Sequence, residues 1–249
     1  MFLDGLEDAY EGGLMGSFAQ TTADAFSLSR KAMDNFAIHS LSKANSAIAD
    51  GVLESEIEAV EITSRKGTVT VTTDEQPGQA RIDKIPRLRA AFKKDGTITA
   101  ANASSISDGA SALVLASEAA VAKNNLTPAA HILGVQSFAG EPGDFTLAPI
   151  SAVQSLLKSI DWQVKDVDLF EINEAFAMVT MLAIQELGLD NSKVNIYGGA
   201  CAQGHPIGST GSRIIVTLMT ALKNQGLKRG VAALCIGGGE ATAVAIELV

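Results

Sequence analysis

Two hydrophobic periods alternate regularly along the second half of the chain. Short apolar runs predict strands at 129–137, 167–172, 193–197, 230–236 and 240–248. Apolar residues spaced three or four apart predict helices between them, at about 149–159, 174–187 and 209–225. Ser209 or Thr210 can cap the start of the last helix, and Gly226 can end it. The order β-α-β-α-β-α-β-β predicts an α/β fold with a mostly parallel sheet, covered by helices, and an antiparallel final pair of strands.

The first half of the chain has a less regular pattern. A helix is predicted over about 27–50, and His39 lies off its apolar stripe, so we expect that side chain to face solvent. Alternating residues predict strands at 56–63 and 68–73. The apolar segment 110–116 is interpreted as a fully buried strand, yet the neighbouring sequence offers it no sheet. We therefore expect a part of the fold to be missing upstream.

Composition limits the class of protein. A chain of 249 residues with 47% hydrophobic residues is long and apolar enough for one large or two small folded domains. The formal charge of −9 argues against binding to nucleic acid or to an anionic membrane surface. No apolar run approaches membrane-spanning length, and the N-terminus has no signal pattern. Two cysteines, Cys201 and Cys235, are too few for a disulfide framework, so a cytoplasmic, reducing location is expected.

Candidate chemistry gathers where three predicted strands end. These stretches are 171–177, the Gly-rich loop 197–213 and 234–239. Because ligands of open α/β sheets collect at the carboxyl ends of strands, one site is expected to contain Asn173, His205 and Cys235. An amide, an imidazole and a thiol together indicate acyl or thioester chemistry, with a base and hydrogen-bond donors for an oxyanion.

Each of these residues also has a simpler interpretation. Asn173 can cap the helix 174–187, Glu174 can be a first-turn charge, and Cys235 can be a small buried hydrophobic residue. His205 can be incidental to an ordinary turn. Cys201 and His205 are four residues apart, but no third ligand is evident and Gly204 and Pro206 break any helix there. We therefore expect no metal site and a structural role for Cys201.

Taken together, five motifs resemble the thiolase family, which contains acetyl-CoA acetyltransferases and 3-ketoacyl-CoA thiolases. They occur in the family's order and span nearly the whole chain: Ser27–Ala37, Asn102–Gly109, Asn173-Glu-Ala-Phe-Ala177, Gly198-Gly-Ala-Cys-Ala-Gln-Gly-His-Pro-Ile-Gly208 and Cys235-Ile-Gly-Gly-Gly239. Each motif alone is modest, whereas five in order are highly specific.

The resemblance implies a role for each site residue. His205 matches the histidine that activates the nucleophilic thiol and helps to hold the thioester oxygen. Cys235 matches the second cysteine, which takes a proton from the α-carbon of acetyl-CoA and returns it. Asn173 matches the residue that fixes a water in the oxyanion hole, and the Gly237 N–H matches a donor of the second hole. Cofactor-binding contacts to the pantetheine fall on Ser104 and on the apolar walls Leu6, Phe92 and Phe176.

Two departures from the family pattern follow from the same comparison of motifs. The family's first cysteine, which carries the acyl group, has no counterpart here, and neither Cys201 nor Cys235 can replace it. We therefore expect a thiolase-like fold in which only the C-terminal part is represented, the N-terminal half is missing and the chain alone is inactive. The expected parts are a partial loop domain at 1–105, the last strand and helix of the N-terminal domain at 106–127, and the C-terminal domain at 128–249. Leu14 stands where some members have a histidine, which leaves the acyl preference open.

The resemblance implies an acyltransferase that catalyses reversible Claisen condensation and thiolytic cleavage of acyl-CoA with acetyl-CoA, through a cysteine thioester. Coenzyme A thioesters enter as substrates, and no metal or redox cofactor is implied. Acyl-CoA and CoA are the expected partners, with no nucleic acid and no membrane. A homo-oligomer, or a complement to an N-terminal thiolase segment, is expected. The alternative is a non-catalytic thiolase-like protein that binds CoA or a partner chain.

Overall fold

A four-stranded sheet forms the centre of the molecule. The computed structural model describes residues 2–249. The sheet has the order β3-β6-β5-β4, with β3 at Ala130–Ala139, β4 at Leu169–Ile172, β5 at Arg229–Ile236 and β6 at Glu240–Leu248. Strand β6 is antiparallel to both β3 and β5, and only β4 and β5 run parallel. The antiparallel final pair is confirmed, whereas the prediction of a mostly parallel sheet is wrong.

The predicted strand at 193–197 does not form, and the side chain of Asn195 explains why. Residues 191–193 make a single 3-10 turn, and Val194 makes one isolated bridge to Phe170. Beyond that bridge, Asn195 Oδ1 accepts a hydrogen bond from the Ile172 N–H at 2.8 Å, and Asn195 Nδ2 donates to the Ile172 oxygen at 2.8 Å. A side-chain amide thus satisfies the edge of β4 in place of a fifth strand.

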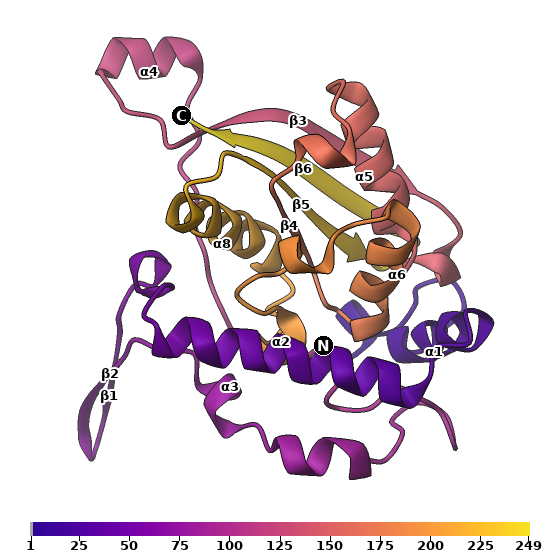
Figure 1. The fold of residues 1–249 in the computed structure, drawn as a ribbon. Helices are drawn as coiled ribbons and strands as arrows, with labels where there is room; N and C mark the ends of the chain where they lie inside the picture. The colour runs from indigo at the N-terminus through magenta and orange to yellow at the C-terminus, as the bar shows by residue number, and fades with distance from the viewer. Residues whose placement is uncertain (1) are drawn as a thin grey trace.

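Helices cover both faces of this sheet (Figure 1). On one face, α5 at Ala148–Ser159 packs on β3, β6 and β5, where the short side chains of Ala241, Ala243 and Ala245 lie buried against it. On the other face, α8 at Thr210–Gln225 packs on β4 and β5. Helix α8 approaches closely because Gly230 has no Cβ, which would lie 2.8 Å from the Leu218 side chain. The layers follow from the period-2 alternation of the strands.

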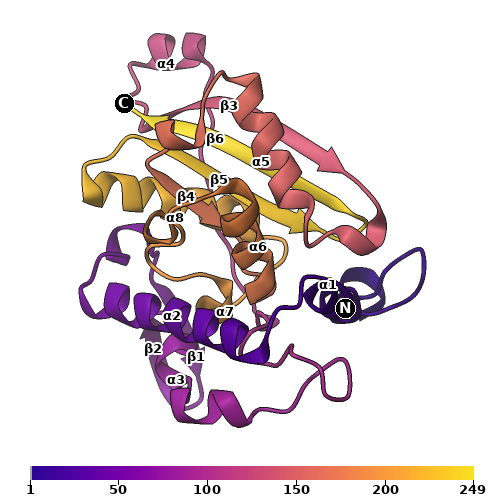
Figure 2. The same ribbon diagram turned by 45° about the vertical axis from the view of Figure 1, so that its right-hand side comes forward.

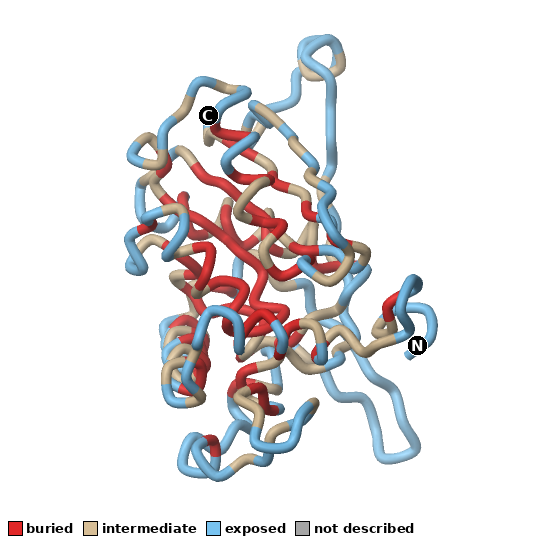
Figure 3. Tube along the Cα trace, turned by 90° about the vertical axis from the view of Figure 1, so that its right-hand side faces the viewer, coloured by how far each residue is buried: buried red, intermediate tan, exposed pale blue. Residues whose placement is uncertain are grey.

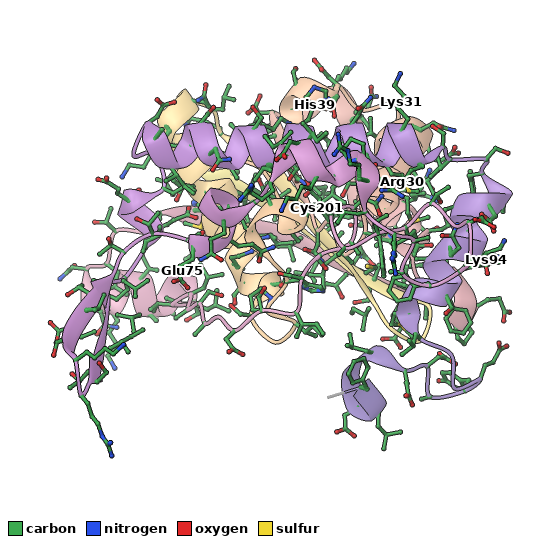
Figure 4. The ribbon with its side chains drawn as sticks, turned by 90° about the horizontal axis from the view of Figure 1, so that it is seen from below. Arg30, Lys31, His39, Glu75, Lys94 and Cys201 are labelled. Atoms are coloured by element: carbon green, nitrogen blue, oxygen red, sulfur yellow. The ribbon has the colours of Figure 1, made fainter. Side chains whose placement is uncertain are left out.

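Below the sheet lies a layer of helices from both halves of the chain. It contains α1 at Met15–Ala25, α2 at Arg30–Ala49, α6 at Ala177–Leu187 and the short α7 at Ala200–Gln203. Helix α2 begins with a Ser29 cap, since the Ser29 Oγ accepts from the Ala32 N–H at 3.1 Å. His39 is exposed, as predicted, on the outer side of α2, whereas Cys201 lies on the inner side (Figure 4). Helix α1 was not predicted, because Gly16 and several small residues keep its apolar stripe short.

The remaining elements are short. Strands β1 at Val60–Ser64 and β2 at Gly67–Val71 form the predicted pair as an exposed antiparallel hairpin. Helix α3 spans Glu75–Gln79, and a π-helical turn spans Phe2–Leu6. Single 3-10 segments occupy Glu54–Glu56, Ile82–Arg87, Pro142–Asp144, Val164–Asp166 and Asn191–Lys193. Within residues 2–249, no helix is both long and apolar enough to cross a membrane.

The predicted buried strand at 110–116 is wrong: this segment forms no strand and is largely exposed. Val114 is 96% exposed and Leu115 is 73% exposed. The segment is held at one end through Ser111, whose hydroxyl lies 2.6 Å from the hydroxyls of both Ser209 and Ser212. It then leads to α4 at Glu118–Asn124, which stands away from the buried part of the molecule (Figure 3). Apolar side chains therefore face outward from an extended backbone.

A buried carboxyl group lies between the sheet and α8. Glu171 is 2% exposed and pairs in register with Ala232, so its side chain lies on the α8 face of β4. Burial raises the pKa of Glu171 to about 8, although the positive charge of Arg213 on α8 acts in the opposite direction. The carboxyl is therefore neutral at the lower end of the physiological pH range and must ionise in a buried place as the pH rises.

The exposed apolar segment predicts self-association through 110–116. Replacing both Val114 and Leu115 by Lys should shift the protein towards monomer and lower the binding of a dye for apolar surfaces. Light scattering and size-exclusion chromatography measure this shift. The control replaces exposed Thr68 and Thr70 on β2 by Lys, which adds the same charge elsewhere. Equal association of both variants and the wild type would show that this segment is not the cause.

The raised pKa of Glu171 predicts how stability depends on pH. Its folded pKa of about 8 lies above the ordinary value of 4.5, so its contribution is fully present below pH 4.5 and is lost as the pH rises towards 8. Relative to wild type, Glu171→Gln should therefore be more stable at pH 8 than at pH 5. Urea unfolding at both pH values measures the difference, and any packing cost of Gln cancels because it is the same at each. Exposed Glu61→Gln is the control, and an equal offset of Glu171→Gln at both pH values would contradict the argument.

Candidate active site

Figure 2 shows the carboxyl end of β5 pointing towards α1. A cavity of about 370 Å³ is lined by residues of both elements. Its walls come from segments far apart in the sequence: the N-terminal turn and the start of α1, the loop around Phe92, residues 103–106, Ala175 and Phe176, the loop of His205, and the end of β5. His205, Cys235, Gly237, Ser104, Leu6, Phe92 and Phe176 all line it. Asn173 lies beside it, in contact with His205. The structure therefore brings all the residues named from the sequence to one place.

Backbone pairing and one hydroxyl group hold His205 in the cavity wall. Its N–H donates to the Ser105 oxygen at 3.1 Å, beside a bridge between residues 106 and 205. On the ring, Nδ1 lies 2.6 Å from the Thr210 Oγ1. The preceding Gly204 has a φ of +90°, and a Cβ there would collide with the side chain of Ser107. The turn that presents the histidine therefore requires glycine at this position.

The partner of Nδ1 determines the tautomer of His205. The Thr210 hydroxyl has one proton and donates it to the Pro206 carbonyl oxygen at 3.0 Å, which can only accept. We assign Thr210 Oγ1 as the acceptor of the Nδ1 proton, because Asn173 Nδ2, which lies against Nε2 on the other side of the ring, can only donate. Nε2 is left without a proton and faces Asn173, whose Nδ2 lies 3.4 Å away. His205 therefore presents a proton-accepting nitrogen towards the site.

The environment of His205 keeps the ring neutral. Burial is the largest cause that lowers its pKa, to about 4, and the positive charge of Arg213 on α8 lowers it further. The ring is therefore a base that is free at neutral pH, and it becomes charged only when a negative charge forms nearby.

Asn173 does not cap a helix, which removes the simpler interpretation of this residue. Helix α6 begins at Ala177, with Phe176 as its N-cap residue. The Asn173 N–H donates to the Ala233 oxygen at 2.9 Å, which extends the pairing of β4 with β5 by one residue. Its Oδ1 is buried and accepts no hydrogen bond from residues 2–249. A buried amide oxygen of this kind requires a donor from a water molecule or a ligand.

Cys235 lies at the end of β5 and is 7% exposed. Burial raises the pKa of its thiol to about 12, against a smaller lowering effect of its own backbone N–H. Backbone N–H groups of the glycines that follow it can favour a nearby negative charge, yet desolvation outweighs any such effect. At neutral pH this residue is therefore a thiol, and its thiolate is a strong base.

Cys201 and Glu174 belong to the packing behind the site. Burial, followed by the charge of Glu174, raises the pKa of the Cys201 thiol well above its ordinary value, and Cys201 is not among the residues that line the cavity. Glu174 is not a first-turn charge of α6. Its carboxylate accepts from Ser40 Oγ at 2.7 Å, Asn195 Nδ2 at 2.9 Å and the Cys201 N–H at 3.1 Å. Among the described residues, no group of three or more His, Cys, Asp and Glu side chains could hold a metal ion.

Aromatic side chains and one serine form the opposite wall. Phe92 and Phe176 meet edge to face, with ring centroids 6.2 Å apart. Ser104 donates through both its N–H and its Oγ to the Ala175 oxygen, at 3.0 and 2.9 Å, so its hydroxyl oxygen can still accept a hydrogen bond. Leu14, at the position where the acyl preference was left open, also lines the cavity.

Several wall residues were not identified from the sequence. They are Met15 and Gly16 at the start of α1, Phe145, Ser105 and the apolar groups Ile106, Ile207 and Ile236. Thr210 was noted only as a possible helix cap, whereas its hydroxyl fixes the ring of His205. A short amphipathic pattern over 15–25 was the available signal for α1. Nothing local marked it as part of a site.

Comparison with known families now identifies both halves of the chain. The model of "Thiolase, C-terminal domain" matches residues 126–248, and that of "Thiolase, N-terminal domain" matches residues 1–119. The predictions that only the C-terminal part of the family is represented and that the N-terminal half of the fold is missing are therefore wrong. The exposed segment 110–116 falls inside the N-terminal match. These matches also give no support to the expectation that a nucleophile-bearing segment is absent.

Individual relatives agree with the family models. The chain is 45% identical over 245 residues to a probable acetyl-CoA acetyltransferase of Dictyostelium discoideum, covering 98% of this chain and 59% of that protein. It is 45% identical to an acetyl-CoA acetyltransferase of Saccharomyces cerevisiae, covering 98% of this chain and 62% of that protein. The chain thus spans about three fifths of the length of these relatives.

Solved structures show the same fold. The acetyl-CoA acetyltransferase of Bacillus anthracis matches with a TM-score of 0.94 and 38% identity, over 98% of this chain and 62% of that one. The Acat5 thiolase of Ascaris suum, solved in complex with coenzyme A, matches with a TM-score of 0.91 and 43% identity, over 99% and 63%. On the family models, the relatives and the shared fold, this chain belongs to the thiolase family.

Proposed function

We propose that this cavity binds coenzyme A thioesters and that the chain takes part in the thiolase reaction, the reversible Claisen condensation and thiolytic cleavage of acyl-CoA with acetyl-CoA through a cysteine thioester. The observation that carries the proposal is the convergence of His205, Cys235 and Gly237 on one apolar cavity, with Asn173 against the imidazole. The names of the relatives and the coenzyme A complex of the Ascaris suum thiolase support the same substrate class.

Cys235 is proposed to move the α-proton of acetyl-CoA. An α-C–H of a thioester is a weak acid, so its removal needs a stronger base than an ordinary thiolate, and a thiol with a pKa of about 12 provides one. In the cleavage direction, the thiol gives its proton to the α-carbon as the C–C bond breaks. In the condensation direction, the thiolate takes that proton before the carbon attacks the acyl thioester. Burial therefore lowers the fraction of Cys235 that is thiolate at neutral pH and makes that thiolate a stronger base.

His205 and its neighbours are proposed to handle the thioester oxygen. The unprotonated Nε2 of His205 accepts the proton of a thiol that attacks the acyl group. The N–H formed in this way then donates a hydrogen bond to the oxyanion. Asn173, whose Oδ1 lacks a partner among the described residues, holds a water in the same oxyanion hole. The Gly237 N–H serves the second hole. No metal or redox cofactor takes part in this proposal, since the donors are all protein groups and water.

The shape and charge of the surroundings fit a coenzyme A thioester. The cavity walls are mostly apolar, which suits an acyl group and the pantetheine, and Ser104 offers the latter a hydrogen-bond partner. In a chain with a net charge of −9, the basic residues Arg89, Lys93 and Lys94 lie within three positions of Phe92 in the sequence. Lys93 pairs with Asp24, so Arg89 and Lys94 are the residues proposed to meet anionic phosphates near that wall. The exposed apolar segment 110–116 favours a homo-oligomer as the assembled form.

The second candidate function is binding of coenzyme A without catalysis. The observation that favours it is the raised pKa of Cys235, because at neutral pH this side chain is a thiol rather than the base. The two functions differ in one partial reaction. A catalytic site exchanges the α-protons of acetyl-CoA with solvent, whereas a binding site does not.

Exchange of these α-protons tests the proposed reaction. In deuterated water, the wild-type chain should incorporate deuterium into the acetyl methyl group of acetyl-CoA, faster at higher pH as the thiolate fraction grows. Cys235→Ser should lower the rate at least about tenfold, equivalent to a barrier increase of ~1.4 kcal/mol. Mass spectrometry of the recovered acetyl-CoA measures the label, and calorimetry measures coenzyme A binding.

Cys201→Ala is the matched control, because this half-buried thiol is not part of the cavity lining; the exchange rate of the variant should stay close to wild type. Binding of coenzyme A without any exchange in the wild type would favour the non-catalytic function. If Cys201→Ala abolishes exchange while Cys235→Ser retains it, the assignment of the working thiol is wrong.

Thr210 is predicted to act as a positioning residue through the tautomer of His205. Thr210→Val removes the acceptor of the Nδ1 proton at nearly constant volume, so the ring becomes free to place its proton on Nε2. The rate of acetyl transfer from acetyl-CoA to a thiol should fall while the melting curve stays cooperative, and Thr210→Ser should restore that rate. The ¹⁵N shifts of the imidazole report the tautomer directly. A wild-type ring with its proton on Nε2 would contradict the assignment.

A further inference from the structure

Gly16 occupies a position in α1 where glycine needs an explanation. The residue is buried in the first turn of an α-helix, and glycine is among the least favourable residues for a helix interior. It is not among the glycines with positive φ, so its backbone conformation is open to any residue. A packing contact must therefore be the reason for glycine here.

That contact is the ring of Phe92. A Cβ on Gly16 would collide with the Cζ, Cε1 and Cε2 atoms of Phe92, the far end of the ring. The ring therefore lies directly against the bare Cα of the helix. Both residues line the cavity, and Phe92 meets Phe176 edge to face on its other side. Phe176 in turn contacts Phe145, with ring centroids 6.4 Å apart.

The backbone that carries Phe92 is tied to α1 and cannot move away easily. The buried side chain of Gln20 accepts hydrogen bonds from the Thr97 and Ile98 N–H groups, at 2.9 and 3.1 Å. The Ala91 N–H donates to the Ile98 oxygen at 2.9 Å, and Lys93 Nζ contacts Asp24 Oδ2 at 2.6 Å. Segment 91–98 is therefore held on both sides of Phe92. A ring displaced from Gly16 has to turn about its own side-chain bonds, and the open space beside it is the cavity.

We propose that Gly16 is a specificity-determining residue: by packing the Phe92 ring against α1, it sets the width of the cavity. Phe92 shares that cavity with Leu14, the position at which the acyl preference was left open, so its width limits the acyl group as well as the pantetheine. This inference rests on the proposed function for the identity of the ligand. The packing of the Phe92 ring against Gly16 does not depend on that function.

The first test concerns the packing of the Phe92 ring against Gly16. A crystal structure of Gly16→Ala should show the Phe92 ring turned into a smaller cavity, with segment 91–98 unmoved. The double variant Gly16→Ala/Phe92→Leu should recover the cavity volume, because Leu lacks the atoms that collide. A ring that stays in place, or that turns away from the cavity, would overturn the inference whatever the protein binds.

The second test concerns specificity, with acetyl-, butyryl- and hexanoyl-CoA as probes in calorimetry. Gly16→Ala should weaken binding of all three, at least about tenfold for hexanoyl-CoA and less for acetyl-CoA, and the added Phe92→Leu should restore the affinities. Gly78→Ala in α3 is the matched control, since no atom lies within 4 Å of a Cβ at that helical glycine. Equal weakening for all three chain lengths, or no rescue by Phe92→Leu, would overturn the inference. If the wild type binds none of the probes, the proposed function fails, and the crystal structures alone decide whether Gly16 sets the cavity width.

Discussion

The buried carboxylate of Glu174 connects the segments on which the site depends. It accepts hydrogen bonds from Ser40 on α2, from Asn195 beside the edge of β4 and from the Cys201 N–H in α7. The loop before α7 reaches it because Gly199 has no Cβ, which would overlap the carboxylate. A buried charge without these donors would be strongly destabilising, so the three segments are fixed relative to one another. The His205 turn and the end of β4 are both built on this arrangement.

From that framework, burial sets the protonation state of the reactive groups. Desolvation lowers the pKa of His205 and raises that of Cys235, so both side chains are uncharged at neutral pH. Forming an imidazolium or a thiolate alone in such a place is unfavourable, because each charge lacks solvent. A reaction that creates opposite charges together, or that moves a proton directly to and from the substrate, avoids this cost. The same exclusion of water that makes the groups unreactive at rest strengthens each hydrogen bond to a developing oxyanion.

Much of the candidate site could be predicted from the sequence because its residues directly follow strands or occur in glycine-rich turns. Asn173 after β4, His205 before α8 and Cys235 at the end of β5 were expected in one site on that basis. The structure places His205 and Cys235 in the wall of one cavity and Asn173 against His205. Sequence patterns did not reveal α1, since the residues that face the cavity there, Met15 and Gly16, have no polar group and gain their meaning from Phe92, which lies far along the chain. The tautomer of His205 likewise depends on which atom Thr210 contacts.

Local sequence determined the helices α2, α5 and α8, the hairpin of β1 and β2, and the final antiparallel pair, because each has a strong period or a clear cap and stop. Only the tertiary structure decided the order and direction of the sheet and its limit at β4. The apolar run at 193–197 has the composition of a strand, yet the Asn195 side chain takes the hydrogen bonds that a strand would have made. The apolar run at 110–116 also has the composition of a strand, but it pairs with no strand among the described residues. Composition gives a segment its tendency to pair, whereas the availability of an unpaired edge decides whether it does so.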